Sequence, residues 1–170
     1  MNSFDAPAQL LVALPTLNDP NFDHTVVFLL RYSIDGALGV VANRIGKTPI
    51  ATLLPAWATL VCEPGRIMLG GPVQIDGLLG FAVTNDGVVN VDLGDPPGRD
   101  LIRVRIFAGY SGWGAGQLDE EIDEGSWLLV DAHPDDLWSP TPETLWDDVI
   151  VRQGGTTRWL ALHPSDPSAN

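Results

Sequence analysis

The chain has 170 residues, 45% of them hydrophobic, and a formal net charge of −13. A chain of this length and hydrophobicity can bury a sizeable core, which excludes a disordered protein. Its acidic balance opposes nucleic-acid phosphates and anionic membranes, so we expect no direct DNA binding and no membrane association. No apolar run is long enough for a membrane helix, and Met1–Asp5 lacks the basic start of a secretory signal.

The numbers of cysteine, glycine and proline residues indicate the compartment and the kind of fold. The only cysteine, Cys62, cannot form an intramolecular disulfide, which predicts a reducing compartment and an inert, buried thiol. The 18 glycines and 14 prolines predict many turns between short elements. We expect a single domain over residues 1–170, with its core at about 9–163 and a frayed tail at 164–170.

The first part of the chain predicts strands at Gln9–Leu14, Thr25–Leu30 and Ala37–Ala42. The second and third are apolar runs without alternation, which is typical of strands buried on both faces. A hairpin turn at Ser33–Gly36 joins them. Thr48 and Pro49 then predict the N-cap and the first residue of a short helix.

The middle of the chain predicts strands at Arg66–Leu69, Gly77–Val83, Val88–Val91 and Leu101–Phe107. In the last of these, residues 102–106 alternate between apolar and charged side chains, with Leu101 and Phe107 on the face of the two arginines. The alternation predicts that Ile102, Val104 and Ile106 face the core. Arg103 and Arg105 are then expected on the opposite, non-core face.

The last part predicts two helices and two strands. The helices are expected at Ala115–Glu124 and from Thr141-Pro142 to Gly154-Gly155. An apolar stripe of Leu145, Trp146, Val149 and Ile150 marks the core face of the second helix. Strands are expected at Ser126–Asp131 and around Leu160 and Leu162.

The stretch Ala108–Leu118 connects the clearest strand to the most acidic run. Its four glycines surround Tyr110, Ser111 and Trp113. Glycine lets other groups approach the backbone, and aromatic side chains offer large apolar faces. The stretch therefore predicts a binding site in a glycine-rich turn, with a partly exposed Trp113 stacking on a ligand. The alternative is that Trp113 is a core residue.

No familiar catalytic or cofactor motif is matched. Gly46-Lys47-Thr48 lacks the earlier glycine of a phosphate-binding loop, because Val41 stands there. Gly109–Gly112 resembles a nucleophile elbow, but Trp113 stands where that motif needs glycine. The dinucleotide fingerprint is absent. We therefore expect no cofactor.

Metal and anion sites are weakly indicated. Asp131, His133 and Asp135 alternate and could face one divalent ion, but Pro134 favours an ordinary turn, so we expect no metal. Arginine suits the capture of carboxylate or phosphate, and the alternative is pairing with some of the 22 acids. The arginines in question are Arg44, Arg66, Arg103 and Arg105.

A set of short motifs occurs in the following order: Leu10–Pro15, Asp19–Phe22, Thr25–Val27, Gly36–Val41 with Asn43-Arg44, Gly70–Val73, Gly109–Trp113 with Gly116–Leu118, and Arg152–Gly155. These motifs resemble the AlgH/YqgE family of bacterial proteins. Two positions depart from it: His24 stands where the family usually has arginine, and Ile45 where it has proline. The first departure puts a role for a basic side chain at position 24 in doubt.

The resemblance implies a fold and a compartment but no reaction. It implies an α+β fold whose mainly antiparallel sheet curls into a flattened pseudo-barrel with a few flanking helices. It also implies a bacterial, cytoplasmic protein without an established biochemical activity; one branch carries the label of a transcriptional regulator.

These observations favour a non-enzymatic binding or regulatory module for an unknown small molecule or protein. The predicted binding residues are Asn43, Arg44, Gly70, Gly71, Tyr110, Trp113 and Gln117. The segments Asn43-Arg44, Gly70-Gly71 and Trp113–Gln117 each follow the end of a predicted strand. We therefore expect these three segments to meet at one rim of the sheet. The alternative is an enzyme of unrecognised type, hydrolase-like or nuclease-like, that uses Asp19, His24 or the acidic run Asp119–Glu124.

Overall fold

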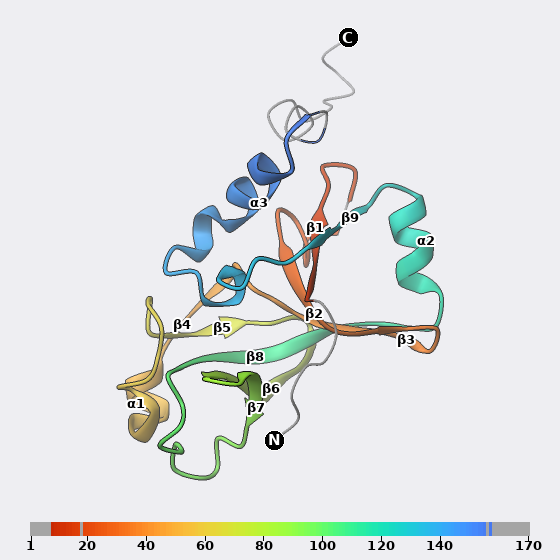
Figure 1. Cartoon of the computed structure of the whole chain (residues 1–170). Coiled ribbons are helices and arrows are strands. Elements are labelled where there is room, and N and C mark those ends of the chain that lie inside the picture. Colours follow the sequence, from red (N-terminus) through yellow and green to blue (C-terminus); the bar gives the residue numbers. More distant parts are fainter. Residues whose placement is uncertain (1–7, 18, 156, 158–170) are drawn as a thin grey trace.

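The computed structural model describes residues 8–17, 19–155 and 157 (Figure 1). The strand expected around Leu160 and Leu162 and the tail at 164–170 lie outside these residues. The strands are β1 Gln9–Ala13, β2 Val26–Ser33, β3 Gly36–Val41, β4 Ile45–Pro49, β5 Arg66–Leu69, β6 Val73–Thr84, β7 Gly87–Val91, β8 Arg103–Trp113 and β9 Trp127–Asp131. The α-helices are α1 Ile50–Leu53, α2 Gln117–Asp123 and α3 Leu145–Gln153, and the 3-10 turns are η1 Pro55–Trp57, η2 Asp136–Trp138 and η3 Pro142–Thr144.

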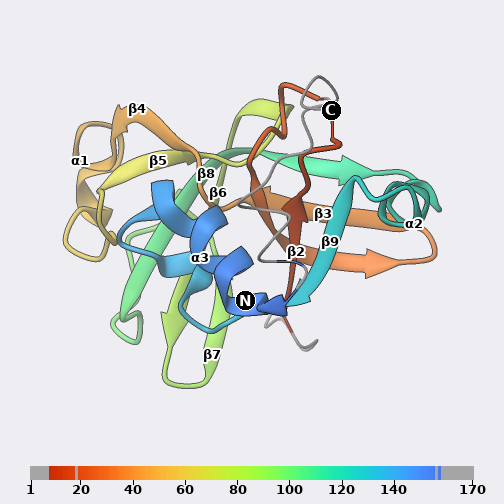
Figure 2. The same ribbon diagram turned by 90° about the horizontal axis from the view of Figure 1, so that it is seen from above.

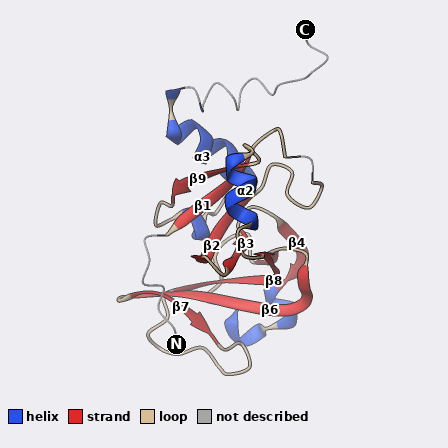
Figure 3. Cartoon of the chain, turned by 90° about the vertical axis from the view of Figure 1, so that its right-hand side faces the viewer, coloured by secondary structure: helices blue, strands red, loops and turns tan. Residues whose placement is uncertain are grey.

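The strands form one curled sheet. Its main path runs β4-β5-β8-β3-β2-β1-β9, and β6 pairs with both β8 and β7. All of these pairings are antiparallel except the one between β5 and β8. Figure 3 shows the sheet folding over itself without closing, so that β1 and β9 lie across from β6 and β7. The expected α+β fold with a mainly antiparallel, curled sheet is confirmed.

The curl gives the strands β1 to β3 two buried faces. In β1, Leu10 and Val12 belong to a core cluster with α3 and η2, whereas Leu11 and Ala13 belong to a second cluster with α2 and β9. Residues Val26–Leu29 of β2 are all buried. The expectation that the unalternating runs are buried on both faces is therefore confirmed. Figure 2 shows α2 and α3 at separate places around the sheet, consistent with these two clusters.

Strand β8 holds the two halves of the sheet together. It pairs with β6 through residues 103–108, with β5 at Phe107 and Ala108, and with β3 at residues 111–113. The sequence predicted a strand that ended at Phe107 and a glycine-rich turn after it, and this was wrong. The strand runs on to Trp113 because the backbone of the glycine-rich stretch continues to pair with its neighbours.

Glycines allow β8 to cross the connection between β5 and β6 at very short range. A Cβ at Gly70 would lie 2.3 Å from the carbonyl oxygen of Gly109, and one at Gly71 would lie 2.3 Å from that of Tyr110. Gly109 has a φ of +72°, in the left-handed region that favours glycine. Ser111 Oγ donates a hydrogen bond of 3.1 Å to Gly70 O across the same contact. We call this contact, formed by residues 70–71 and 109–111, the glycine crossing.

The curl also overturns the predicted faces of β8. Val104 and Ile106 are buried as expected, but Ile102 precedes the strand and is 54% exposed. Arg105 and Phe107, on the supposed non-core face, are as fully buried as the core face. Both faces of this part of β8 are covered, so alternation of residue type could not identify a single core face.

The first helix also differs from its prediction. Residues Ile45–Pro49 form the strand β4, in which Pro49 pairs with Arg66 of β5. The helix α1 begins only at Ile50, with Pro49 as an N-cap that makes no side-chain hydrogen bond. Strand pairing, a tertiary contact, overrides the local N-cap signal of Thr48-Pro49. Among the described residues, no helix has the length and apolarity needed to span a membrane.

Trp113 is part of the core beneath α2. Its ring is 7% exposed, stacks on Phe22 with centroids 5.9 Å apart, and meets Trp127 edge-on at 5.8 Å. Both indole nitrogens donate to the same carboxylate oxygen of Glu121, each at 2.9 Å. Gln117 donates to the other oxygen of Glu121, also at 2.9 Å. The prediction that Trp113 is a partly exposed platform is wrong, and the alternative of a core residue is confirmed.

We predict that Gly71→Ala destabilises the protein by about 3 kcal/mol or more, because the new Cβ meets backbone atoms that cannot move independently. Chemical denaturation measures the loss. Gly87→Ala is the matched control: Gly87 has a φ of +133° but no atom within 4 Å of the added Cβ. The control should lose only about 1–2 kcal/mol from backbone strain. Equal losses in the two variants would show that the glycine crossing is not under steric constraint.

We predict that Trp113→Ala lowers the free energy of unfolding by about 3–5 kcal/mol, since it leaves a cavity and removes a donor from Glu121. Urea denaturation followed by circular dichroism provides the measurement. The control is Leu53→Ala, at a side chain that is 51% exposed. Its change should stay within about 0.5 kcal/mol. A Trp113→Ala loss well under about 2 kcal/mol would contradict the buried position.

Candidate functional site

A groove of about 310 Å³ lies beside two of the predicted binding residues, Arg44 and Gly71. It is lined mainly by Asn21, Arg44, Leu69, Gly71, Pro72 and Ile75. These residues come from the loop between β1 and β2, from the residue before β4, and from the end of β5, the start of β6 and the connection between them. The groove therefore gathers segments that are distant in the sequence, and we call it the Arg44 groove.

Asn43 and Arg44 anchor the loop of residues 19–24 to the sheet. Asn43 Oδ1 accepts a hydrogen bond from Val26 N, and Asn43 Nδ2 donates to His24 O, both at 2.9 Å. The Arg44 guanidinium donates to three carbonyl oxygens of the same loop, those of Pro20, Asn21 and Asp23. The first task of this pair is structural, because it fixes one wall of the groove.

The charge of Arg44 has no acidic partner. Among the described residues, none of the ion pairs includes this side chain. Three neutral carbonyls hold the guanidinium in one orientation but leave its unit charge uncompensated. A half-buried, fixed cation beside a groove in an acidic protein is suited to an anionic group.

Gly70 and Gly71 are needed mainly for the close backbone contact in the fold, and not to leave space for a ligand. Both belong to the glycine crossing, where other backbone atoms already occupy the space beside them. Gly70 O also accepts hydrogen bonds from Val41 N at 2.8 Å and from Ser111 Oγ at 3.1 Å. Gly71 still borders the groove. Tyr110 pairs with Val73 in the sheet and packs against the core.

The three predicted segments do not all meet. Asn43-Arg44 and Gly70-Gly71 come together, and Leu69 N donates to Arg44 O at 2.9 Å between them. Trp113 pairs with Ala37, at the opposite end of β3 from Asn43. Gln117 opens α2 and accepts a hydrogen bond from Gly114 N at 3.1 Å. The expected convergence is thus correct for two segments and wrong for the third, because β3 separates them along its length (Figure 1).

The sequence analysis did not predict the two exposed apolar side chains of the groove. Leu69 and Ile75 are 48% and 63% exposed and flank the groove. Ile75 lies where β6 departs from β8: four residues, Gln74 to Gly77, separate the pairs Val73–Tyr110 and Leu78–Ala108, and Gln74 has a left-handed φ of +50°. The signal available in the sequence was an isoleucine outside every predicted strand. Strand patterns alone do not distinguish such a bulge from a turn.

Asp19 and His24, named for the enzymatic alternative, are engaged locally. Asp19 Oδ1 accepts from Asn21 N at 2.9 Å, which closes a turn. The His24 ring lies 4.8 Å from the Trp146 ring, and its Nδ1 is 2.7 Å from Asp23 Oδ1. In the described part of the chain no three His, Cys, Asp or Glu side chains group as metal ligands. His133 and Asp135 instead lie 3.9 Å apart, and Asp135 also pairs with Arg103.

The shifted titratable groups lie outside the groove. Burial lowers the pKa of the Arg105 guanidinium, and burial also raises the pKa of the half-buried Cys62 thiol. A raised thiol pKa lowers the thiolate fraction, in keeping with an inert cysteine. The pKa of Arg152 is raised because its guanidinium holds Asp136 through two 2.8 Å hydrogen bonds. This pair fastens α3 to η2.

Comparison with known proteins places these features in a family. A family model described as AlgH-like matches residues 10–158. A UPF0301 protein of Streptomyces avermitilis is 44% identical over 181 residues and aligns with 95% of this chain and 94% of its own. A UPF0301 protein of Thermobifida fusca is 38% identical and aligns with 100% and 98% of the two chains.

Two solved structures share the fold. The crystal structure of protein DIP2367 from Corynebacterium diphtheriae has a TM-score of 0.83 at 28% identity and covers 94% of each chain. The solution structure of the AlgH protein from Pseudomonas aeruginosa has a TM-score of 0.68 at 26% identity and covers 91% of this chain and 92% of its own. With the family model and the close relatives in agreement, the chain belongs to the AlgH-like family of bacterial proteins.

Proposed function

We propose that this protein is a non-enzymatic binding or regulatory module of the bacterial cytoplasm. In this proposal the Arg44 groove binds a segment of a partner protein that combines an apolar side chain with a carboxylate. The proposal rests on two features of one groove: a fixed guanidinium that has no ion-pair partner among the described residues, and two exposed apolar side chains, Leu69 and Ile75.

The chemistry of the groove supports such a partner. Exposed apolar side chains grouped at a groove are typical of interaction surfaces. Leu69 and Ile75 can bury their exposed area against an apolar side chain of the partner. The Arg44 guanidinium keeps unused donors after its three carbonyl contacts, because arginine carries five N–H groups. A carboxylate placed there would compensate its charge.

The loop of residues 19–24 supports the same proposal through preorganisation. Asn43 and Arg44 hold this loop with hydrogen bonds to its backbone before any partner arrives. A wall that is already ordered costs less conformational entropy on binding. The cytoplasmic location is supported by the single cysteine, Cys62, whose thiol is free.

We predict that peptides selected from a random display library on the immobilised protein are enriched in sequences that combine acidic and large apolar residues. Ile75→Ser and Leu69→Ser should each weaken such a peptide about tenfold or more, since each removes apolar contact area. Fluorescence anisotropy of a labelled peptide gives the affinities. Affinity should also fall as salt concentration rises, because Arg44 contributes a charge.

The matched control is Ile34→Ser, which removes a side chain that is 88% exposed at the β2–β3 turn, away from the groove. All three side chains are exposed, so the stability of each variant should stay within about 0.5 kcal/mol of the wild type. Peptides that lose as much affinity to Ile34→Ser as to Ile75→Ser would refute the groove as the binding site. So would an absence of any enriched sequence.

We also propose that duplex DNA is not a partner. The net charge is −13, and from Ile106 to Val151 there is no lysine or arginine. Non-specific affinity for DNA comes from phosphate contacts, which such a surface disfavours. Anisotropy titration of a labelled duplex at about 150 mM salt should show no binding below micromolar concentrations. Sub-micromolar binding under these conditions would contradict the prediction.

A further inference from the structure

A second hollow lies where the curled sheet stays open. It has a volume of about 410 Å³ and contains none of the residues predicted from the sequence to bind a ligand. Its walls come from β2, from the β6–β7 hairpin and from the segment between β9 and η2. The principal lining side chains are Phe28, Val88, Leu137 and Trp138, with His133 and Asp131 toward the rim. We call it the seam cavity.

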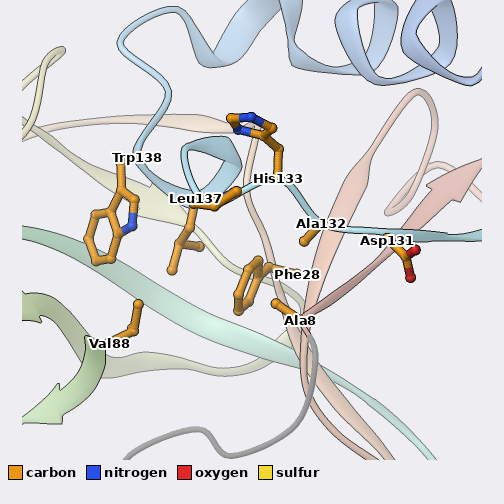
Figure 4. A pocket seen from close by; sticks show the side chains of 9 residues that line it. Ala8, Phe28, Val88, Asp131, Ala132, His133, Leu137 and Trp138 are labelled. Carbon is orange, nitrogen blue, oxygen red and sulfur yellow. The ribbon is translucent and has the colours of Figure 1, made fainter. Parts of the chain in front are cut away.

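The interior of the seam cavity is apolar. Figure 4 shows the side chains of Phe28, Val88, Leu137 and Trp138 around one space, whereas Asp131 points away from them. A volume of several hundred Å³ with mainly apolar walls is typical of a small-molecule site. The two aromatic walls, Phe28 and Trp138, suit a ligand with a flat ring system.

One polar group inside this cavity is left without a partner. Trp138 as a whole is 3% exposed, but its indole nitrogen is not one of the fully enclosed atoms: it donates no hydrogen bond to a described residue and is open to the cavity. In Figure 4 this nitrogen lies on the edge of the ring that faces Leu137 and Phe28. An indole N–H that is open to an apolar hollow can donate to an acceptor on a ligand that enters it. The vacant donor therefore specifies where a ligand's acceptor atom would lie.

Arg103 lies over the ring of Trp138 and, like Arg105, does not line the cavity itself. The Arg103 guanidinium lies 5.5 Å from the centre of the Trp138 ring. Arg103 and Val88 are in one cross-strand row, since both pair with Val83. Arg103 is balanced by Asp135 at 3.3 Å. The next arginine along this face of β8 has no such balance.

Arg105 is a buried cation without a counter-ion among the described residues. Its side chain is 1% exposed, and its Nε has no hydrogen-bond partner. Nη2 donates to Ser139 O at 2.6 Å, directly after Trp138 in the chain, and Nη1 lies 3.6 Å from Met68 Sδ. Burying an unpaired charge is costly, and a nearby anion reduces the cost. The acid of the neighbouring η2, Asp136, is already held by Arg152.

We propose that the seam cavity binds a small aromatic monocarboxylate. Its ring lies between Phe28, Val88 and Leu137, and its carboxylate accepts the Trp138 indole N–H in the field of Arg103 and Arg105. This site is independent of the Arg44 groove, since the two hollows share no lining residue.

The test follows indole N–H signals by nuclear magnetic resonance during titration with 2-naphthylacetate. The Trp138 signal, identified by its loss in Trp138→Phe, should move and saturate. The indoles of Trp113, Trp127 and Trp146 are internal controls, because they already donate to Glu121 or to Ala13 O. Trp57 is a further control: its hollow contains Asp92, Asp95 and Asp100, which repel a carboxylate.

Affinities measured by calorimetry separate the contribution of the Trp138 donor from those of the arginine charge and of the apolar walls. Trp138→Phe keeps a ring but removes the donor, and should weaken 2-naphthylacetate about tenfold or more. The uncharged 2-naphthylethanol should bind the wild-type protein about tenfold more weakly than 2-naphthylacetate does. In Arg105→Met, the affinities of the alcohol and the carboxylate should differ by a smaller factor. Val88→Phe, which fills the cavity, should abolish binding and serves as the second variant if Trp138→Phe does not fold.

Three outcomes would overturn the proposal. The first is that the Trp138 signal shows no saturable shift up to about 5 mM 2-naphthylacetate. The dissociation constant would then exceed the millimolar range, which is too weak for specific recognition of a small molecule. The second is that the alcohol binds as tightly as the carboxylate, since the arginines would then play no part. The third is that Val88→Phe, correctly folded, binds 2-naphthylacetate as wild type does.

Discussion

The backbone contact at the glycine crossing is the constraint on which the rest of the fold depends. Residues 70–71 pass so close to 109–111 that a Cβ at Gly70, Gly71 or Gly109 would lie within 2.5 Å of a backbone oxygen. This proximity allows β8 to exchange one neighbour, β5, for another, β3, on the same edge. A sheet that changes neighbours within one strand cannot stay flat, and the curl follows from that.

The curl then decides what is buried. It covers both faces of β8, so Arg105 becomes a buried cation while Phe107 and Met68 complete the core around it. It also presses β1 to β3 between two clusters, one with α3 and one with α2. Glu121 completes the second cluster by accepting hydrogen bonds from two buried indoles. A single backbone contact thus has consequences for charge burial far along the chain.

Both hollows of the protein are products of the same geometry. The Arg44 groove lies beside the glycine crossing, where the bulge of β6 leaves Ile75 exposed. The seam cavity lies between β7, which ends the branch that β6 starts from β8, and the segment after β9, which ends the main path. The Arg44 groove combines apolar side chains with an arginine that lacks an acidic partner among the described residues, whereas no arginine lines the seam cavity itself. Our two proposals therefore assign anionic ligands to two separate hollows of this acidic AlgH-like protein.

The sequence by itself determined the local elements. Most strands lie within a few residues of their predicted bounds, because apolar runs and turn residues act over short range. The motifs at Asn43-Arg44 and Gly70-Gly71 identified one side of a groove and, through their resemblance, the family. The pattern also gave the two buried faces of β2 correctly.

The tertiary structure decided the roles of the residues in these elements. Trp113 was expected at a ligand because glycines flank it, but packing against Phe22 and Trp127 makes it core. Arg105 was expected on an outer face because alternation assumes one covered side, whereas the curl covers both. Trp138 gave no sequence signal at all, since a vacant donor is defined only by what surrounds it. Local sequence fixes which backbone conformations are favourable; which side chains meet, and which remain unpaired, depends on contacts between distant segments.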